Sequence, residues 1–173
     1  MSLVFLLGGA RSGKSALAVE LARRAGEPVV VLATAEARDE EMAERIREHR
    51  DARPADWEVV EAPVELLAAL RRVDDRVTIV LDCLSLWVAN MLDRDSDVEQ
   101  QARDAALLAA EREGLTIVVS NEVGLGIVPA SALARRYRDV LGRVNATWAA
   151  SADEAAFVVA GRALRLDPAQ ALL

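Results

Sequence analysis

The sequence has almost no lysine, histidine or cysteine, although it is rich in charged residues. Of the 21 Lys and Arg residues among its 173 positions, Lys14 is the one lysine and the other 20 are arginine. There is one histidine, His49, and one cysteine, Cys83. Any chemical step that needs an ammonium group or an imidazole from this chain must therefore use Lys14 or His49.

The shortage of cysteine, positive charge and long apolar runs excludes several classes of protein. One cysteine cannot form an internal disulfide or a cysteine-rich zinc site, and such usage suits a reducing cytosol. The net charge of −7 and the pI near 4.9 argue against a nucleic-acid binder, which needs a basic face. No stretch reaches the ~18 apolar residues of a membrane span, and residues 3–7 lack a signal peptide's length and basic leader. We therefore expect a cytoplasmic protein.

The length and the apolar pattern indicate one α/β domain, residues 1–173. At about 150 residues per domain the chain has room for one domain, and it contains no repeat, low-complexity segment or linker. Buried strands of a mostly parallel sheet are predicted at residues 3–7, 29–33, 77–81, 115–119 and 155–160, with 57–62 as a shorter candidate. Helices are predicted at 15–25, 39–52, 63–73, 98–113 and 130–150, and helical spacing also follows residue 82. This alternation predicts a three-layer α/β fold, while residues 162–173 are too weakly patterned to assign.

A phosphate-binding motif lies between the first predicted strand and the first predicted helix. Residues 8–15 read GGARSGKS, which fits the Walker A pattern G-x-x-x-x-G-K-[ST]. In such a loop backbone N–H groups turn onto phosphate oxygens at a helix N-terminus. Lys14 would reach the β- and γ-phosphates, and the Ser15 hydroxyl would ligate Mg²⁺. We therefore expect a P-loop NTPase-type fold of the RecA-like kind rather than a glycine-rich turn without a ligand.

A carboxylate suited to the same metal ion ends another predicted strand. Residues 77–82 read VTIVLD, so Asp82 stands at the carboxyl end of a parallel strand, where ligands bind in open α/β sheets. This is the Walker B pattern, and Asp82 would hold Mg²⁺ directly or through water. Asp82 could also cap the following helix, and the two roles are compatible.

The single histidine lies in a highly charged segment with helical spacing. His49 continues the helix face of Met42 and Ile46, so it could simply end an apolar stripe. A neutral imidazole can also attack phosphorus as a nucleophile, and neighbouring guanidinium groups oppose its protonation. Four arginines flank it and could clamp a triphosphate or pair with adjacent acidic side chains: Arg45, Arg47, Arg50 and Arg53.

Five blocks in order make the sequence resemble the bifunctional adenosylcobinamide kinase / adenosylcobinamide-phosphate guanylyltransferase family of cobalamin biosynthesis. They are GGARSGKS; AT followed by DEEMAERIREHR; RPADW with Glu61 just beyond; SNEVGLGIVP; and LARRYRDVLGRVN, spanning about residues 3–161. Many families share the first block, whereas the last two are much more specific. Some members have Glu in place of Asp82, and two adjacent histidines in place of Glu48 and His49.

The resemblance implies two reactions. First, the primary hydroxyl of the aminopropanol arm of adenosylcobinamide receives the γ-phosphate of ATP or GTP. Second, His49 attacks the α-phosphate of GTP and releases pyrophosphate, and the guanylyl–histidine passes GMP to the cobinamide phosphate to give adenosylcobinamide-GDP. The resemblance also implies Mg²⁺ as cofactor and a homotrimer.

The same resemblance assigns roles to individual residues. Catalysis falls to His49 and Lys14, and metal binding to Ser15 and Asp82. Glu61 would accept from guanine N–H groups or ribose hydroxyls, although a strand-end acid can also be merely exposed. The implied nucleotide contacts are Gly8, Gly9, Ala10, Arg11, Ser12, Gly13, Lys14, Ser15, Thr34, Ala35, Glu36, Arg50, Asp51, Ala52, Arg53, Glu61 and Asp82.

The block SNEVGLGIVP, residues 120–129, follows a predicted strand and so lies at the ligand end of the sheet. Asn121 and Glu122 would face the phosphates or the incoming hydroxyl, and Arg138 on the next helix is a further substrate or interface candidate. A structural loop whose glycines serve turn geometry is the alternative.

Two other functions stay open from the residues alone. An ordinary small-molecule P-loop kinase without nucleotidyl transfer would leave His49 structural. A non-catalytic GTP-binding protein is disfavoured because the sequence has no NKxD-type guanine-specificity motif.

Overall fold

A computed structural model describes residues 2–26, 28–94 and 96–172. Its sheet has seven strands in the order β3-β2-β4-β5-β1-β6-β7. β7 pairs antiparallel with β6, and all the other neighbouring strands pair in parallel. The predicted α/β fold with a mostly parallel sheet is therefore confirmed. The strands are β1 (Leu3–Gly8), β2 (Val29–Ala33), β3 (Glu58–Glu61), β4 (Thr78–Asp82), β5 (Thr116–Asn121), β6 (Glu154–Val159) and β7 (Arg162–Leu166).

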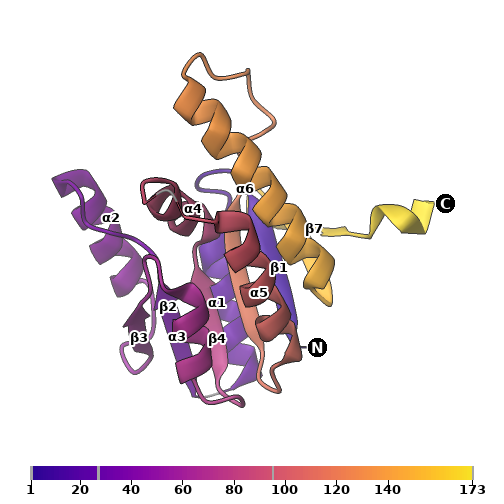
Figure 1. The fold of residues 1–173 in the computed structure, drawn as a ribbon. Coiled ribbons are helices and arrows are strands. Elements are labelled where there is room, and N and C mark those ends of the chain that lie inside the picture. The colour runs from indigo at the N-terminus through magenta and orange to yellow at the C-terminus, as the bar shows by residue number, and fades with distance from the viewer. Residues whose placement is uncertain (1, 27, 95, 173) are drawn as a thin grey trace.

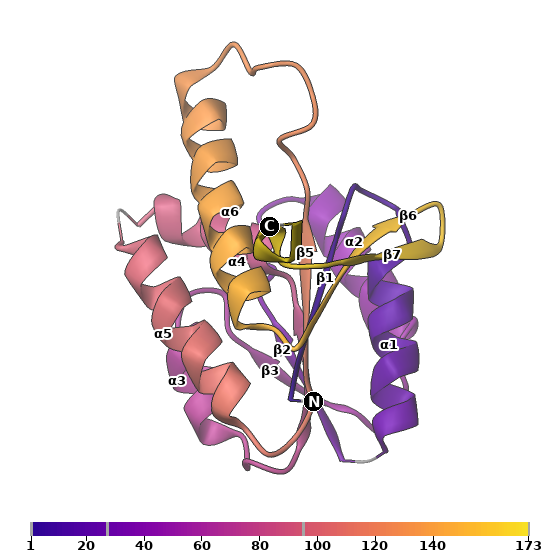
Figure 2. The same cartoon turned by 90° about the vertical axis from the view of Figure 1, so that its right-hand side faces the viewer.

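Helices cover both faces of the sheet and complete three layers (Figures 1 and 2). α1 (Lys14–Ala25) lies on one face, and α3 (Leu66–Arg72), α4 (Leu84–Leu92), α5 (Val98–Glu111) and α6 (Ala132–Ser151) lie on the other. α2 (Glu40–Asp51) stands apart from the other helices, at the left of Figure 1, and η1 (Ala169–Leu172) follows β7. Among the described residues, no helix has the length and apolarity needed to cross a membrane.

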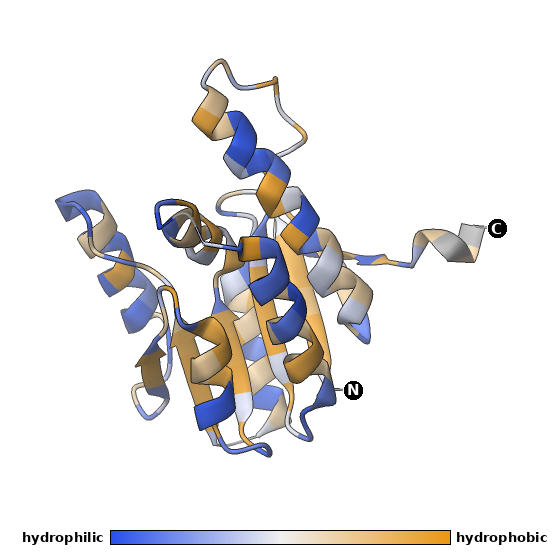
Figure 3. Ribbon diagram, in the orientation of Figure 1, coloured by the Kyte–Doolittle hydropathy of each residue, from blue (hydrophilic) through white to orange (hydrophobic). Residues whose placement is uncertain are grey.

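The strands are continuous apolar runs because both of their faces are buried. In β1, Leu3 and Phe5 pack into the core beneath α3 to α6, whereas Val4 and Leu6 pack against the α1 side. Figure 3 shows largely hydrophobic strands between helices that carry both hydrophilic and hydrophobic residues. Burial on both sides makes the sheet a rigid base for the loops at its carboxyl edge.

Strand β7 lies in the segment that the sequence pattern leaves unassigned. Ala160 and Gly161 both have positive φ, 49° and 71°, and this geometry favours a two-residue hairpin turn. The turn returns the chain along the free edge of β6. Most β7 side chains are exposed, so no alternation of buried and exposed residues marks the strand in the sequence.

Candidate nucleotide-binding and transfer site

A cavity of about 470 Å³ lies at the carboxyl edge of the sheet. The Walker A loop and the start of α1 form one wall, and the ends of β4 and β5 contribute Asp82 and Asn121. Helix α2 contributes another part of the lining through Met42, Ile46 and His49. Two segments that the sequence marks separately, the phosphate loop and the histidine helix, therefore border one space.

The Walker A loop turns tightly between β1 and α1. Gly13 and Arg11 have positive φ, 102° and 55°. A Cβ on Gly8 would lie 2.2 Å from the carbonyl oxygen of Val158 on β6, so glycine alone allows this close approach. The N–H of Gly161 donates to the carbonyl of Ser12 at 2.9 Å, so the β6–β7 turn braces the loop. Together these contacts hold the loop in one conformation.

The buried ammonium group of Lys14 points back into this loop. Its Nζ donates to the carbonyl oxygen of Gly9 at 2.7 Å. Burial lowers the pKa of Lys14, and the nearby Cys83 and Asp82 oppose that shift. The buried Ser12 hydroxyl has no hydrogen-bond partner among the described atoms. A phosphate oxygen in the loop would accept from both groups.

Asp82 joins the histidine helix to the end of β4. Its Oδ2 accepts from Arg53 Nη2 at 2.7 Å and lies 3.5 Å from Nδ1 of His49. Burial alone would raise the pKa of Asp82, but His49 and Arg53 outweigh burial and hold that pKa below its ordinary value. The Asp82 side chain is 10% exposed, whereas that of His49 is 51% exposed. His49 is thus oriented by a buried carboxylate while its ring stays accessible from the cavity.

The four arginines around His49 have different surroundings. Arg53 forms the buried pair with Asp82, and Arg45 lines the cavity. Arg47 pairs with Glu44 on α2 itself, and Arg50 is exposed and lines neither described cavity. Arg45 and Arg53 therefore border the cavity, whereas Arg47 and Arg50 do not.

The other nucleotide contacts implied by resemblance fall into three groups. Ala35 and the loop residues Ala10 to Ser15 line the main cavity. Ala52 lines a smaller adjoining cavity of about 230 Å³, which His49 also borders. The remaining members line neither described cavity: Gly8, Gly9, Thr34, Glu36, Arg50, Asp51 and Glu61.

Several of these outlying residues have structural partners instead. The Thr34 hydroxyl donates to the carbonyl of Cys83 at 2.7 Å and accepts from its N–H at 2.9 Å. Glu36 forms ion pairs with Arg38 and Arg94. Both residues thus hold the segment between β2 and α2 in place.

Of the three substrate candidates, one lines a described cavity and two do not. Asn121 lines it and donates through Nδ2 to Ser85 Oγ at 2.9 Å. Glu122 accepts from the N–H of Gly124, and Arg138 pairs with Asp139. Of the three, the structure brings Asn121 to the Walker A loop.

Ser15 and Asp82, the expected Mg²⁺ ligands, both line the cavity. The described residues contain no cluster of three or more His, Cys, Asp or Glu side chains suited to a metal. Mg²⁺ usually binds through one or two protein oxygens together with substrate phosphates and water. One hydroxyl and one carboxylate beside a phosphate loop therefore fit Mg²⁺.

A Walker A loop followed by a helix, at the carboxyl edge of a parallel sheet with Asp82 on a nearby strand end, defines a P-loop nucleotide-binding protein. The sequence model of one family, described as cobinamide kinase / cobinamide phosphate guanyltransferase, matches residues 4–166. The chain belongs to this cobinamide kinase / cobinamide phosphate guanyltransferase family.

Three relatives carry names consistent with this family. The bifunctional adenosylcobalamin biosynthesis protein CobP of Pseudomonas aeruginosa is 45% identical over 159 residues, covering 90% of this chain and 92% of its own. The proteins named CobU from Escherichia coli and Salmonella typhimurium are 37% and 38% identical, each covering 95% of this chain and 99% of its own. The family predicted from the five blocks is therefore confirmed, and with it a transferase of cobalamin biosynthesis. Because the family combines both activities, it favours a bifunctional enzyme over a simple kinase or a non-catalytic GTP-binding protein.

Proposed function

We propose that this chain phosphorylates adenosylcobinamide with ATP or GTP and then transfers GMP from GTP to the product through a guanylylated His49. One observation carries the proposal: Lys14 and His49, the chain's one lysine and one histidine, line the same cavity. The two activities in the family description support it.

In the kinase step the corrinoid hydroxyl attacks the γ-phosphorus, the bond to the β–γ bridging oxygen breaks, and the nucleoside diphosphate leaves. Lys14 and the N–H groups of the loop hold the phosphates, since phosphoryl transfer depends mainly on positioning and charge neutralisation. Asn121, which lines the cavity, would contact the incoming hydroxyl. Mg²⁺, when held by Ser15 and Asp82, would supply further charge neutralisation.

In the guanylyl step a nitrogen of His49 attacks the α-phosphorus of GTP, and pyrophosphate leaves. The Asp82 carboxylate beside Nδ1 favours a proton on that nitrogen, so Nε2 keeps the lone pair needed for attack. The phosphate oxygen of the cobinamide phosphate then attacks the same phosphorus and breaks the P–N bond, which regenerates His49. Arg45 and Arg53, which both line the cavity, would hold the triphosphate.

We also propose a cytoplasmic homotrimer. The chain's single, buried, unpaired cysteine suits a reducing compartment. Exposed apolar side chains on the segment between β5 and α6 support self-association, because such patches are typical of interaction sites.

The covalent step is tested with Mg²⁺ and GTP labelled at the α-phosphate. We expect label that survives denaturation, is labile to acid and stable to base, and is lost in His49→Asn. GTP labelled at the γ-phosphate is the control and should leave no label on the protein. Wild-type protein that binds GTP but retains no α-label would refute the guanylyl–histidine.

The kinase step is tested with the complementary variants. Cobinamide-dependent transfer of the γ-phosphate should persist in His49→Asn and collapse in Lys14→Ala, because Lys14 alone supplies an ammonium group to the loop. Equal kinase activity of Lys14→Ala and wild type would refute the role of Lys14.

A further inference from the structure

Helix α2, which carries His49, has little packing of its own to hold it in place. Among the described residues 40–51 that form it, none is buried, and its half-buried Met42 and Ile46 face the cavity. Helices in proteins owe most of their stability and placement to packing of an apolar face. The position of α2 must therefore depend on contacts at its two ends.

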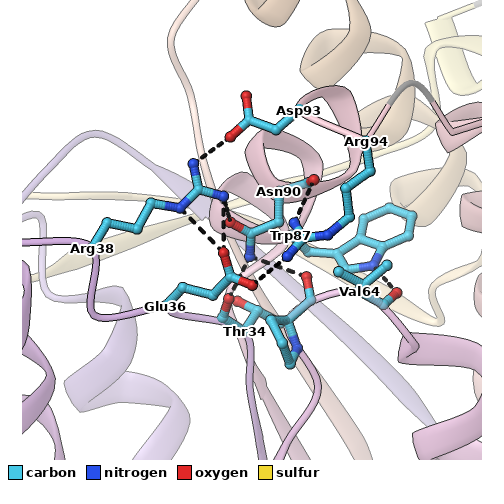
Figure 4. A network of polar contacts seen from close by, with 9 residues as sticks. Thr34, Glu36, Arg38, Val64, Trp87, Asn90, Asp93 and Arg94 are labelled. Carbon is cyan, nitrogen blue, oxygen red and sulfur yellow. Dashed lines mark hydrogen bonds and ion pairs between the residues drawn. The ribbon is translucent and has the colours of Figure 1, made fainter.

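At the carboxyl end of α2 the restraint is the buried Arg53–Asp82 pair described above. At the amino end, the linker from β2 is bound to the end of α4 by an ion-pair and hydrogen-bond network (Figure 4). We call this network the α2 clamp, and its members are Glu36, Arg38, Asn90, Asp93 and Arg94.

Arg38 and Arg94 carry the charged contacts of the α2 clamp. Arg38 Nη2 donates to Glu36 at 2.9 Å and to Oδ1 of Asn90 at 2.9 Å, and Nη1 pairs with Asp93. Arg94 Nη2 donates to the other oxygen of Glu36 at 2.6 Å, and its Nη1 donates to the backbone carbonyl of Asn90 at 2.9 Å. Glu36 is therefore held between two guanidinium groups that are themselves fixed to α4.

Asn90 supplies the buried part of the α2 clamp. Its Nδ2 donates to the carbonyls of Thr34 at 2.8 Å and Pro63 at 3.0 Å, while its Oδ1 accepts from Arg38. One side chain, 4% exposed, thus joins the β2–α2 linker, the β3–α3 linker and α4. Trp87 on the same helix reinforces this junction by donating to the carbonyl of Val64 at 2.8 Å.

We propose that the α2 clamp is a positioning device that sets the distance from His49 to the nucleotide on the Walker A loop. This inference rests on the proposed function, because it concerns the guanylyl step. The clamp residues touch no reacting atom: they fix the linker, the linker fixes α2, and α2 fixes the imidazole. Displacing a reacting group by about 1 Å can lower the reaction rate by 10²-fold. Loss of the clamp contacts would therefore lower the rate of His49 guanylylation while leaving nucleotide binding at the Walker A loop intact.

The test uses the full chain with Arg38→Gln and Arg94→Gln combined. The matched control is Arg24→Gln with Arg143→Gln, which removes the same charge and two exposed ion pairs, with Glu20 and Glu99, away from the clamp. For each protein three quantities are measured: the single-turnover rate of His49 guanylylation against GTP concentration, the kinase kcat, and hydrogen exchange of residues 35–51.

In the clamp variant we expect the guanylylation rate at saturating GTP to fall at least about tenfold, with half-saturating GTP and kinase kcat within about twofold of wild type. Exchange of residues 35–51 should be faster, and the control variant should match wild type in all three. A purely structural role would lower both activities together.

An equal loss of the two activities, or an unchanged guanylylation rate, would overturn the clamp's role. If wild-type protein forms no adduct, the proposed function fails. In that case hydrogen exchange of residues 35–51 still tests the clamp separately. Faster exchange in the clamp variant would support the clamp as the anchor of α2, and unchanged exchange would overturn it.

Discussion

Lys14 and His49 line one cavity, and their surroundings differ in a way that suits their proposed roles. Lys14 is buried in a rigid loop, where a compact ammonium group can sit between phosphate oxygens. His49 is half exposed on a helix with no buried residue among those described. The binding group is thus held in a buried loop, whereas the group proposed to carry GMP is oriented by Asp82 and depends on the α2 clamp for the position of its helix.

Tyr137 provides a test of how burial shifts the pKa of a single side chain. Its hydroxyl donates to the carbonyl of Ser85 at 3.1 Å. Burial, with a smaller contribution from Cys83, raises the pKa of Tyr137 to about 12, although the Ser85 contact opposes the shift. Between pH 10 and 12 the unfolded chain loses this proton while the folded chain keeps it, so the stability of the wild type falls as pH rises.

We therefore predict that wild-type protein loses more stability than Tyr137→Phe between pH 9.5 and 11.5. The extra loss should approach about 1 to 2 kcal/mol, since one group contributes at most ~1.4 kcal/mol per pH unit. Urea unfolding of both proteins at the two pH values measures it. Because every other group titrates alike in the two proteins, parallel losses would show that Tyr137 titrates normally.

At the scale of the elements, replacing either of two glycines by alanine should change the stability of the protein in opposite directions. Gly142 lies within α6, and a Cβ there meets nothing within 4 Å. Gly114, before β5, approaches the backbone so closely that a Cβ would lie 2.6 Å from the carbonyl oxygen of Val77. One glycine therefore weakens a helix, and the other permits a close turn.

Gly142→Ala should stabilise the protein by about 0.5–1 kcal/mol, because alanine is the better helix former. Gly114→Ala should destabilise the protein. The added Cβ would clash with the backbone at Val77, so the segments that lead into β4 and β5 would have to move apart. Thermal and urea unfolding at neutral pH measure both changes. The same sign of change in the two variants would contradict this account of the two glycines.

At the scale of the whole molecule, an apolar arm projects beyond the sheet. Residues 122–131 and the start of α6 extend past the other elements (Figure 2). On this arm Leu125 is 81% exposed and Ile127 is 97% exposed, with Val128 and Leu133 also exposed. A cluster of this kind costs free energy in water unless another surface covers it.

We predict that wild-type protein sediments as a trimer of the 18.7 kDa chain and that Leu125→Asp with Ile127→Asp sediments as a monomer. Burying two carboxylates in an apolar contact is strongly unfavourable. Leu107→Asp, at an exposed leucine on α5, is the control and should keep the wild-type mass. A monomeric wild type, or an unchanged mass in the double variant, would exclude the arm as a trimer contact.

Local patterns in the sequence determined the alternation of strands and helices, the Walker A loop with Lys14, and the acidic strand end at Asp82. Each depends on spacing over a few residues, where side-chain periodicity and glycine positions reflect the backbone directly. The five blocks likewise predicted the family, which the comparisons confirmed. Spacing alone left His49 open as the end of an apolar stripe, and the family resemblance assigned it the role of nucleophile.

Tertiary structure alone decided which distant residues meet. His49 reaches Asp82, Arg53 pairs with the same carboxylate, and Glu36 is bound to Arg94 from a separate helix. Strand β7 likewise forms because the edge of β6 is available to it. Such contacts depend on how the sheet orders its strands and places its helices, and no local spacing carries that information. The segments that line the site could thus be predicted separately from the sequence. Only the folded structure shows that they border a single cavity.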